Sequence, residues 1–190
     1  WRISWADGRV IDADYAGGLV DMSGFVTNTC GDAVAETWVY SPVRRTVGAW
    51  IGFTVTGSAY KRQHDEPMPK LGEWSKYGSS IEINGVRISP PRWKNPGAKA
   101  DMSKQDADGK SYKGAVYSND LCEIPIDGEW YFIRDPAPVE LNAGWNHVRL
   151  SMPRPPKMWG RVWRGIFRLL EGTSARPREV KGIEWSSVPR

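Results

Sequence analysis

Glycine and proline interrupt this chain at short intervals, and apolar and polar residues alternate between the interruptions. The 190 residues include 20 glycines and 14 prolines. No stretch repeats its apolar residues with the period of about 3.6 that an amphipathic helix requires. Alternation with a period of two instead places apolar side chains on one face of a strand. Short strands separated by turn residues are typical of antiparallel sandwiches and barrels, so the sequence predicts an all-β fold.

Residues 47–55 give the clearest strand pattern. Every second residue from Val47 is apolar, which predicts one face directed toward a core. Trp50 lies on the opposite face between two glycines. Such a ring could receive a flat ligand, but we expect a second layer or a neighbouring strand to cover it.

Residues 33–40 precede this strand and alternate in the same way. Val34, Trp38 and Tyr40 share one face, and smaller residues occupy the other. Pro42 ends the pattern because proline has no N–H to donate to a sheet. The connection at residues 43–45 is short enough for a hairpin, so this segment is predicted to pair with residues 47–55.

The Asn84-Gly85 dipeptide lies between two alternating segments. Asn-Gly favours a two-residue hairpin turn in which both residues have positive φ. The resulting register pairs Ile83 with Val86, Glu82 with Arg87, and Ile81 with Ile88. We expect the apolar pairs to face one way and an ion pair of Glu82 and Arg87 to face the other.

Further strands are predicted at residues 130–133, 139–141, 146–152, 162–170 and 183–185. In the fourth of these, Trp163, Phe167 and Leu169 share a face with Gly165. The long polar segments at residues 60–77 and 90–121 are predicted loops, which in compact domains are often functional.

Length and charge limit the remaining possibilities. A chain of 190 residues suits one domain with a well-buried core, although residues 1–28 could be either a linker or a peripheral strand. The chain starts with Trp1 and has neither a signal peptide nor an apolar run that could span a membrane, so we expect it to be a piece of a longer protein. Its net charge of +4 permits an acidic partner, but no recognition helix indicates nucleic acid.

Metal and disulfide sites have weak support. Cys30 and Cys122 are the only cysteines, and either a disulfide or two buried thiols fits them. A zinc site that added His64 and His147 would lack the paired ligand spacing of such sites. Asp106 and Asp108 precede a glycine as in part of a calcium loop, but the distal glutamate is missing. We therefore expect no metal and no cofactor.

Catalytic motifs are also absent. The chain has no P-loop, GxSxG, HExxH or dinucleotide fingerprint. The adjacent carboxylates Asp65 and Glu66 follow a histidine, but they lie in a polar loop with nothing to hold them in place. With Glu36 and Glu129 they are the candidates for an enzyme that acts alone. We expect no catalytic residues in this chain.

Eleven tryptophans are the strongest functional signal. Four of them lie in polar segments rich in Pro, Gly, Lys and Arg: Trp74, Trp93, Trp130 and Trp159. The Asn-Gly hairpin would bring Trp74, Tyr77 and Trp93 to one end of a sheet beside Arg92. Aromatic surfaces with polar groups nearby can bind sugars. The alternative is that these rings pack the hairpin onto the sandwich or onto a neighbouring domain.

Four segments occur together and in order: residues 37–42, residues 47–51, the Ile83-Asn84-Gly85 turn followed by Pro90-Pro91 and Trp93, and residues 136–153 around Leu141-Asn142-Ala143-Gly144-Trp145-Asn146. Residues 33–185 thereby resemble the C-terminal β-sandwich attached to bacterial family 20 glycoside hydrolases, the β-N-acetylhexosaminidases. This domain is similar to galactose-binding-like jelly rolls. In that family the catalytic Asp-Glu pair lies on a separate barrel, so no catalytic role transfers to Asp65 and Glu66.

The resemblance implies a non-catalytic accessory domain of a secreted, periplasmic or cell-surface bacterial enzyme. Its partners would be a glycan containing an aminosugar or galactose and the catalytic domain of the same polypeptide. Trp74, Tyr77, Trp93 and Arg92 are the candidate carbohydrate-binding residues. Two alternatives remain open: a domain that only braces the catalytic barrel, and a jelly-roll enzyme that acts on glycans by itself.

Overall fold

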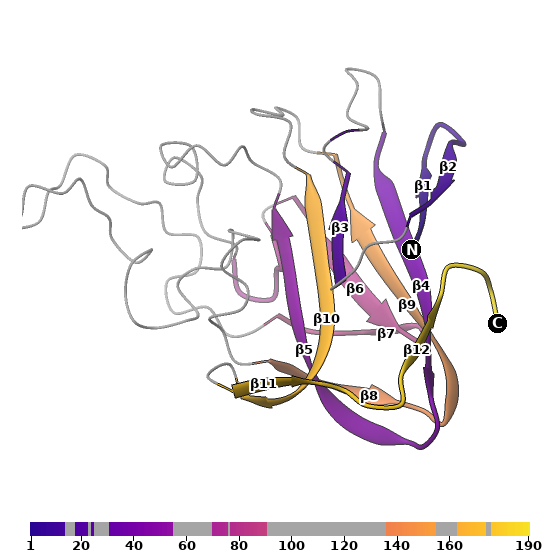
Figure 1. The fold of residues 1–190 in the computed structure, drawn as a ribbon. Helices are drawn as coiled ribbons and strands as arrows, with labels where there is room; N and C mark the ends of the chain where they lie inside the picture. The colour runs from indigo at the N-terminus through magenta and orange to yellow at the C-terminus, as the bar shows by residue number, and fades with distance from the viewer. Residues whose placement is uncertain are drawn as a thin grey trace, which may run out of the picture.

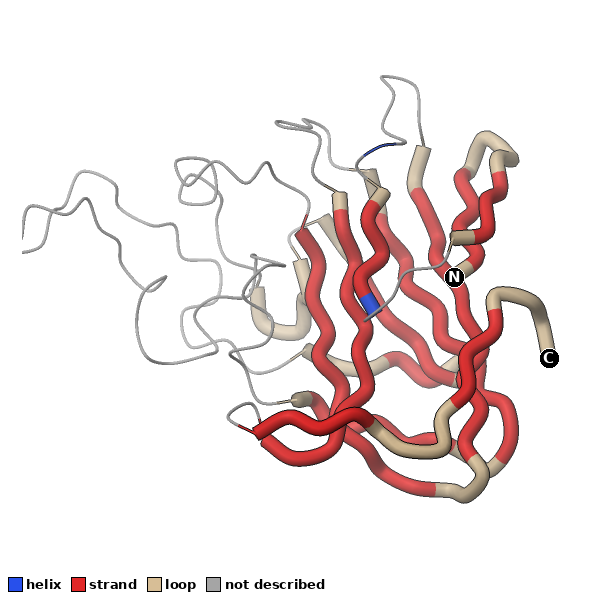
Figure 2. The backbone as a smooth tube through the Cα atoms, viewed as in Figure 1, coloured by secondary structure: helices blue, strands red, loops and turns tan. Residues whose placement is uncertain are grey.

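The computed structural model describes residues 1–13, 18–22, 24, 31–54, 70–75, 77–90, 136–154, 163–173 and 176–190. Within these ranges the chain forms twelve strands and no α-helix. The strands make two antiparallel sheets packed face to face (Figure 1), and strand backbone accounts for most of the described chain (Figure 2). This confirms the prediction of an all-β antiparallel sandwich. The strand predicted at residues 130–133 and most of the two predicted loops lie outside the described residues.

Each sheet has a long central pair of strands. The first sheet runs in the order β2 (Val10–Asp12), β1 (Arg2–Trp5), β4 (Ala33–Ser41), β9 (Gly144–Met152), β6 (Ser80–Ile83) and β7 (Val86–Arg87), with β12 (Glu184–Ser186) paired to β4. The second runs in the order β11 (Arg176–Glu179), β10 (Arg164–Thr173), β5 (Arg45–Thr54) and β8 (Ala137–Leu141), with β3 (Leu19–Asp21) paired to β10.

Apolar side chains from the two inner faces form one core. The second sheet contributes Val47, Ala49, Ile51, Phe53, Val139, Leu141, Phe167 and Leu169. The first sheet contributes Ile3, Ala35, Val39, Ile81, Ile83, Val148, Leu150 and Met152. Burying each of the larger side chains stabilises the fold by about 2 kcal/mol. The period-two pattern of residues 47–55 therefore assigned the inner face of β5 correctly.

Gly165 faces inward on β10 beside Phe167 and Leu169, as predicted. A Cβ atom at this position would lie 2.7 Å from Met152 Sδ and 3.2 Å from Leu150 Cδ1 on the opposite sheet. The missing side chain therefore allows the two sheets to approach closely at this point.

The predicted hairpin of β4 and β5 is wrong, because the two strands belong to different sheets. β4 pairs along its whole length with β9, so it has no free edge on that side. The connection after Ser41 passes instead from one sheet to the other. There Ser41 Oγ donates to the Val43 carbonyl at 2.7 Å, and Arg45 Nε donates to Ser41 Oγ at 3.1 Å. Alternation assigns an inner face to each strand but does not say which strand lies beside it.

The Asn84-Gly85 hairpin is confirmed. Both residues have positive φ, 52° and 77°. The predicted pairs of Ile83 with Val86 and of Glu82 with Arg87 form, and the Ile88 N–H donates to the Ile81 carbonyl at 3.0 Å. The expected ion pair differs, however: the recorded partner of Glu82 is Arg149 at 3.9 Å, because β9 lies along the other side of β6.

Trp50 is covered, as expected. It lies on the outer face of the second sheet and is only 5% exposed. Ile166 and Leu170 on β10 share this face and are also buried. The neighbouring Gly48 lies against Pro136, whose Cβ atom would be 2.7 Å from a Cβ atom at position 48. Apolar residues therefore shield Trp50 on this outer face, and Arg168, directly opposite Trp50 in the register, is the partly exposed residue beside it.

The first segment of the chain is part of the sandwich where it is described. β1 pairs with β4, and β3 pairs with β10. Ile3, Trp5, Val20 and Met22 are buried in the core. Of the two readings of residues 1–28, a linker and a peripheral strand, the described part supports strands.

On one side of the sandwich, each sheet has an edge shared by two short strands. β1 pairs with residues 33–36 of β4, and β12 pairs with residues 38–40. Similarly, β3 pairs with residues 164–166 of β10, and β11 pairs with residues 170–173. Thr37 in the first sheet and residues 167–169 in the second lie at the two interruptions. Here the two sheets leave space for a pocket.

Candidate functional site

Trp74 is not the exposed platform that the sequence suggested. It is 3% exposed, and its indole Nε1 donates to the Ile88 carbonyl at 2.8 Å. Its ring packs edge-on against Phe53, with centroids 6.2 Å apart. The ring attaches the segments around the hairpin to the core. This corresponds to the packing alternative stated for this cluster.

Tyr77 lies close to Trp74 in sequence and is partly buried against the same core. This burial raises the pKa of the Tyr77 phenol above its usual value of 10.0. Ser75 Oγ accepts the Tyr77 N–H and donates to Ser79 Oγ, so hydrogen bonds fix the turn. Arg92 and Trp93 lie outside the described residues. Trp74 and Tyr77 are the described residues of the predicted sugar site, and both belong to a turn that packs against the core.

Of the candidate acids, only Glu36 is described. Its carboxylate lies 2.9 Å from His147 Nε2 on the outer face of the first sheet. The other residues considered for catalysis, metal binding or a disulfide lie outside the described residues: Cys30, His64, Asp65, Glu66, Asp106, Asp108, Cys122 and Glu129. Glu36 is therefore the hydrogen-bond partner of His147.

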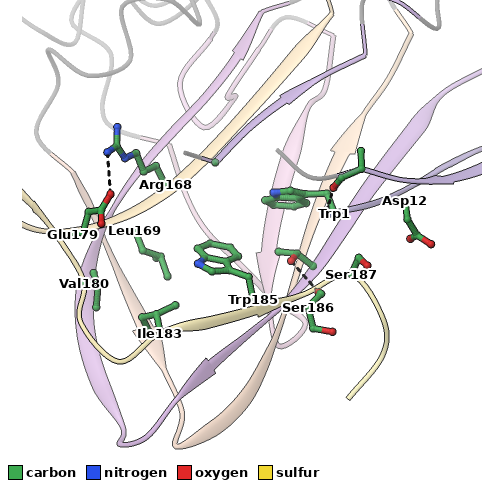
Figure 3. A pocket seen from close by; sticks show the side chains of 13 residues that line it. Trp1, Asp12, Arg168, Leu169, Glu179, Val180, Ile183, Trp185, Ser186 and Ser187 are labelled. Carbon is green, nitrogen blue, oxygen red and sulfur yellow. Dashed lines mark hydrogen bonds and ion pairs between the residues drawn. The ribbon is translucent and has the colours of Figure 1, made fainter. Parts of the chain in front are cut away.

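A pocket of about 610 Å³ lies at the two interrupted edges (Figure 3). Thr37 lines it from the first sheet, and Arg168 and Leu169 line it from the second. β12 and the turn before it add Val180, Ile183 and Trp185, among others. Its volume falls within the range of small-molecule sites, about 300–1,000 Å³.

Trp185 is the main aromatic surface of the pocket. It is 46% exposed, although register places it on the same face of the sheet as buried Val39. Trp1 lies beside it with centroids 6.4 Å apart, and the Phe167 ring packs against both. Figure 3 shows Trp185 between Trp1 on one side and Leu169 with Ile183 on the other. Packing holds the ring in place and leaves part of its surface exposed.

Polar groups surround this ring. Arg168 Nη2 lies 3.8 Å from Glu179 Oε1 at one end of the pocket, and Asp12 lies at the other end (Figure 3). Near Trp185, the Ser186 carbonyl accepts a hydrogen bond from Thr37 Oγ1 at 3.1 Å. This bond ties β12 to the interrupted edge of β4. The pocket thus combines an aromatic centre with donors and acceptors at both ends.

The outer face of the first sheet carries a second group of aromatic rings. Trp38 stacks on His147 with centroids 4.9 Å apart and an interplanar angle of 16°. Tyr40 packs against Trp145, and the Arg190 guanidinium lies 5.6 Å from the centroid of Trp145. His147 thus covers one face of Trp38, and Arg190 lies over one face of Trp145. The Trp185 pocket is therefore the better candidate for a ligand that needs an aromatic face.

The described ranges contain no group of three His, Cys, Asp or Glu side chains placed to hold a metal ion. Among the same residues, no helix is long and apolar enough to cross a membrane.

The sequence signal for this pocket was slight. Residues 183–185 were predicted as a strand, and β12 confirms a strand at Glu184–Ser186. Trp185 precedes two serines. Such a polar setting is unusual for a buried ring and agrees with the partial exposure of Trp185. Its exposure depends on the interrupted edges, which bring residue 185 beside residue 1 through contacts that no local pattern encodes.

No protein-family model, curated protein or solved structure matches this chain. A functional assignment therefore has to come from the chemistry of the pocket.

Proposed function

We propose that this chain is a non-catalytic carbohydrate-binding domain and that the Trp185 pocket is its binding site. The exposed, firmly packed ring of Trp185 in a pocket of about 610 Å³ carries the proposal. Sugar rings have apolar C–H faces that stack on aromatic rings, while their hydroxyl groups need hydrogen-bond partners. The resemblance of residues 33–185 to accessory domains of glycoside hydrolases supports the same function.

The polar groups of the pocket suit hydroxyl recognition. The Arg168–Glu179 pair offers donors and acceptors side by side, and Ser187 adds a hydroxyl. A small-ligand site usually combines an apolar surface with a small number of polar groups. The Trp185 ring would supply affinity, and the polar ends would orient the sugar.

A binding role fits the described carboxylates better than a hydrolytic one. Glycosidases need two carboxyl groups in different environments, one of them desolvated so that it keeps its proton. Both carboxylates that line the pocket, Asp12 and Glu179, are exposed, and the side chain of Glu179 is 89% exposed. Neither carboxylate has the desolvated environment that a general acid needs.

Binding of the labelled protein to a broad glycan array tests this function. We expect saturable binding to a defined glycan class. Trp185→Ala should weaken it at least about tenfold, as expected for an aromatic anchor. Trp185→Phe keeps a ring and should retain part of the affinity.

Trp38→Ala is the matched control, because Trp38 is a half-buried tryptophan that stacks on His147 outside the pocket. It should leave glycan binding unchanged. No binding to any glycan, with all variants folded by circular dichroism, would reject the proposal and favour a domain that braces a neighbour. Turnover of a chromogenic aminosugar by the purified chain would also contradict it.

A further inference from the structure

We infer that the ligand of the Trp185 pocket is an acidic glycan, a chain of sugars that carry carboxylates. The inference rests on the proposed function and concerns the charge around the same pocket. One wall is formed by β10, by β11 and by the turn that leads to Trp185. This wall has an excess of positive charge.

The charges of this wall can be counted from the described residues. Between Arg168 and Ile183 there are four cationic side chains and two carboxylates: Arg168, Arg176, Arg178 and Lys181 against Glu171 and Glu179. A fifth cation comes from β5, because Arg45 Nη2 donates to the Lys181 carbonyl at 2.8 Å. Glu184 follows this wall but shares the outer face of the first sheet with Tyr40, opposite to Trp185, so the wall carries a net charge of plus three.

Each carboxylate of the wall already has an arginine partner. Glu171 lies 4.0 Å from Arg45, and Glu179 lies 3.8 Å from Arg168. Among the described residues no ion pair is recorded for the other three cations: Arg176, Arg178 and Lys181. All three are exposed. Their charges are therefore available to a ligand.

These three cations flank pocket residues along the chain. Arg178 precedes Glu179 and Val180, which line the pocket, and Lys181 follows them. An extended glycan with one sugar on Trp185 would pass over this wall as it leaves the pocket. A row of cations attracts a polyanion and raises its local concentration.

The opposite end of the pocket has a different charge. Asp12 lies there, on the far side of Trp1 from Arg168 (Figure 3). Its cross-strand neighbour is Arg2. Arg2 and Asp12 balance each other, so this end has no excess of positive charge, and an acidic chain would extend from Trp185 toward β11.

The test uses three polyuronates of different sugar composition: polygalacturonate, alginate and polyglucuronate. Each is compared with its carboxyl-reduced form, which has the same backbone without the negative charge. We expect at least one polyuronate to bind, with its reduced form at least about tenfold weaker. Raising sodium chloride from about 50 mM to about 500 mM should weaken the acidic interaction, because salt screens exposed charges.

Two variants locate the charge effect. The triple variant Arg176→Gln, Arg178→Gln, Lys181→Gln should lower affinity for the polyuronate about tenfold and leave affinity for its reduced form unchanged. A control that removes equal charge at residues that do not line the pocket, Lys70→Gln, Arg87→Gln, Arg149→Gln, should bind as the unaltered protein does. Trp185→Ala should weaken both forms of the glycan.

Equal binding of a polyuronate and its reduced form would overturn the inference and leave the proposed function standing. The same conclusion follows if only neutral glycans bind, or if the triple variant at β11 has no effect.

Polyglutamate serves as a polyanion without sugar rings. Binding of polyglutamate as tight as that of the polyuronates, and unchanged by Trp185→Ala, would overturn the inference. The surface would then bind polyanions in general. No binding to any acidic or neutral glycan would reject the proposed function itself.

Discussion

Among single residues, Asn146 makes the densest set of hydrogen bonds described in this fold. Its side chain is fully buried at the start of β9. Asn146 Oδ1 accepts from Asn84 Nδ2 and from the Asn142 N–H, both at 2.8 Å. Asn146 Nδ2 donates to the carbonyls of Val39, Asn142 and Gly144 at 3.0–3.2 Å. One amide therefore connects the hairpin, the turn before β9 and β4.

Asn146→Ala should lower the free energy of unfolding by about 3 kcal/mol, because it leaves several buried polar groups without a partner. Urea denaturation measures this change. Asn142→Ala is the control: its exposed side chain is removed while its backbone groups stay, so a loss below about 0.5 kcal/mol is expected. Equal losses in the two variants would contradict this role of Asn146.

Tyr77 gives a prediction on pH. Burial raises the pKa of its phenol above 10.0, so the folded protein holds this proton more tightly than the unfolded chain. The stability from this proton is fully present below pH 10 and is lost as pH rises through the raised pKa. Tyr77→Phe should therefore make the fall in unfolding free energy above pH 10 less steep. Urea titrations across that range measure the slope, and identical slopes would refute the prediction.

At the scale of strands, the sequence predicted well which side chains share a face of a strand, and poorly which strands pair with one another. Alternation correctly assigned the inner face of β5 and separated the two faces of β4, and Asn84-Gly85 predicted its turn and register. The pairing of β4 with β5 was wrong, because an inner face can meet its partner across the core as well as along a sheet. Trp74 was misplaced for a related reason: its polar neighbours suggested a surface, while the hairpin places its ring against Phe53.

Two strand glycines should differ in their tolerance of a methyl group. At Gly165 the methyl would meet the flexible thioether of Met152, which can move aside. At Gly48 it would meet the rigid ring of Pro136 and the Leu170 carbonyl, 2.7 Å and 3.1 Å away. We expect Gly165→Ala to cost about 1 kcal/mol and Gly48→Ala about 3 kcal/mol in unfolding free energy. Thermal or urea denaturation gives the order, and a larger loss at Gly165 would contradict this packing.

At the scale of the whole molecule, the candidate site results from how the two sheets end. β1 and β12 share one edge of β4, and β3 and β11 share one edge of β10. The pocket lies where both edges are interrupted, and Trp1 and Trp185 meet there. The sequence shows the abundance of tryptophan and the basic residues near β11, but only the fold brings its first and last strands together. A local pattern could therefore suggest sugar binding without locating the pocket.

The most direct test of the central claim is an NMR titration that follows the indole N–H signals of the tryptophans. Trp185→Phe identifies the signal of Trp185, and the ligand is the tightest binder from the glycan array. The Trp185 signal should shift and saturate with added glycan, and that of neighbouring Trp1 should follow, while the signals of Trp38 and Trp145 stay in place. An unmoved Trp185 signal, or a shift confined to Trp38 and Trp145, would show that the Trp185 pocket is not where the protein binds sugar.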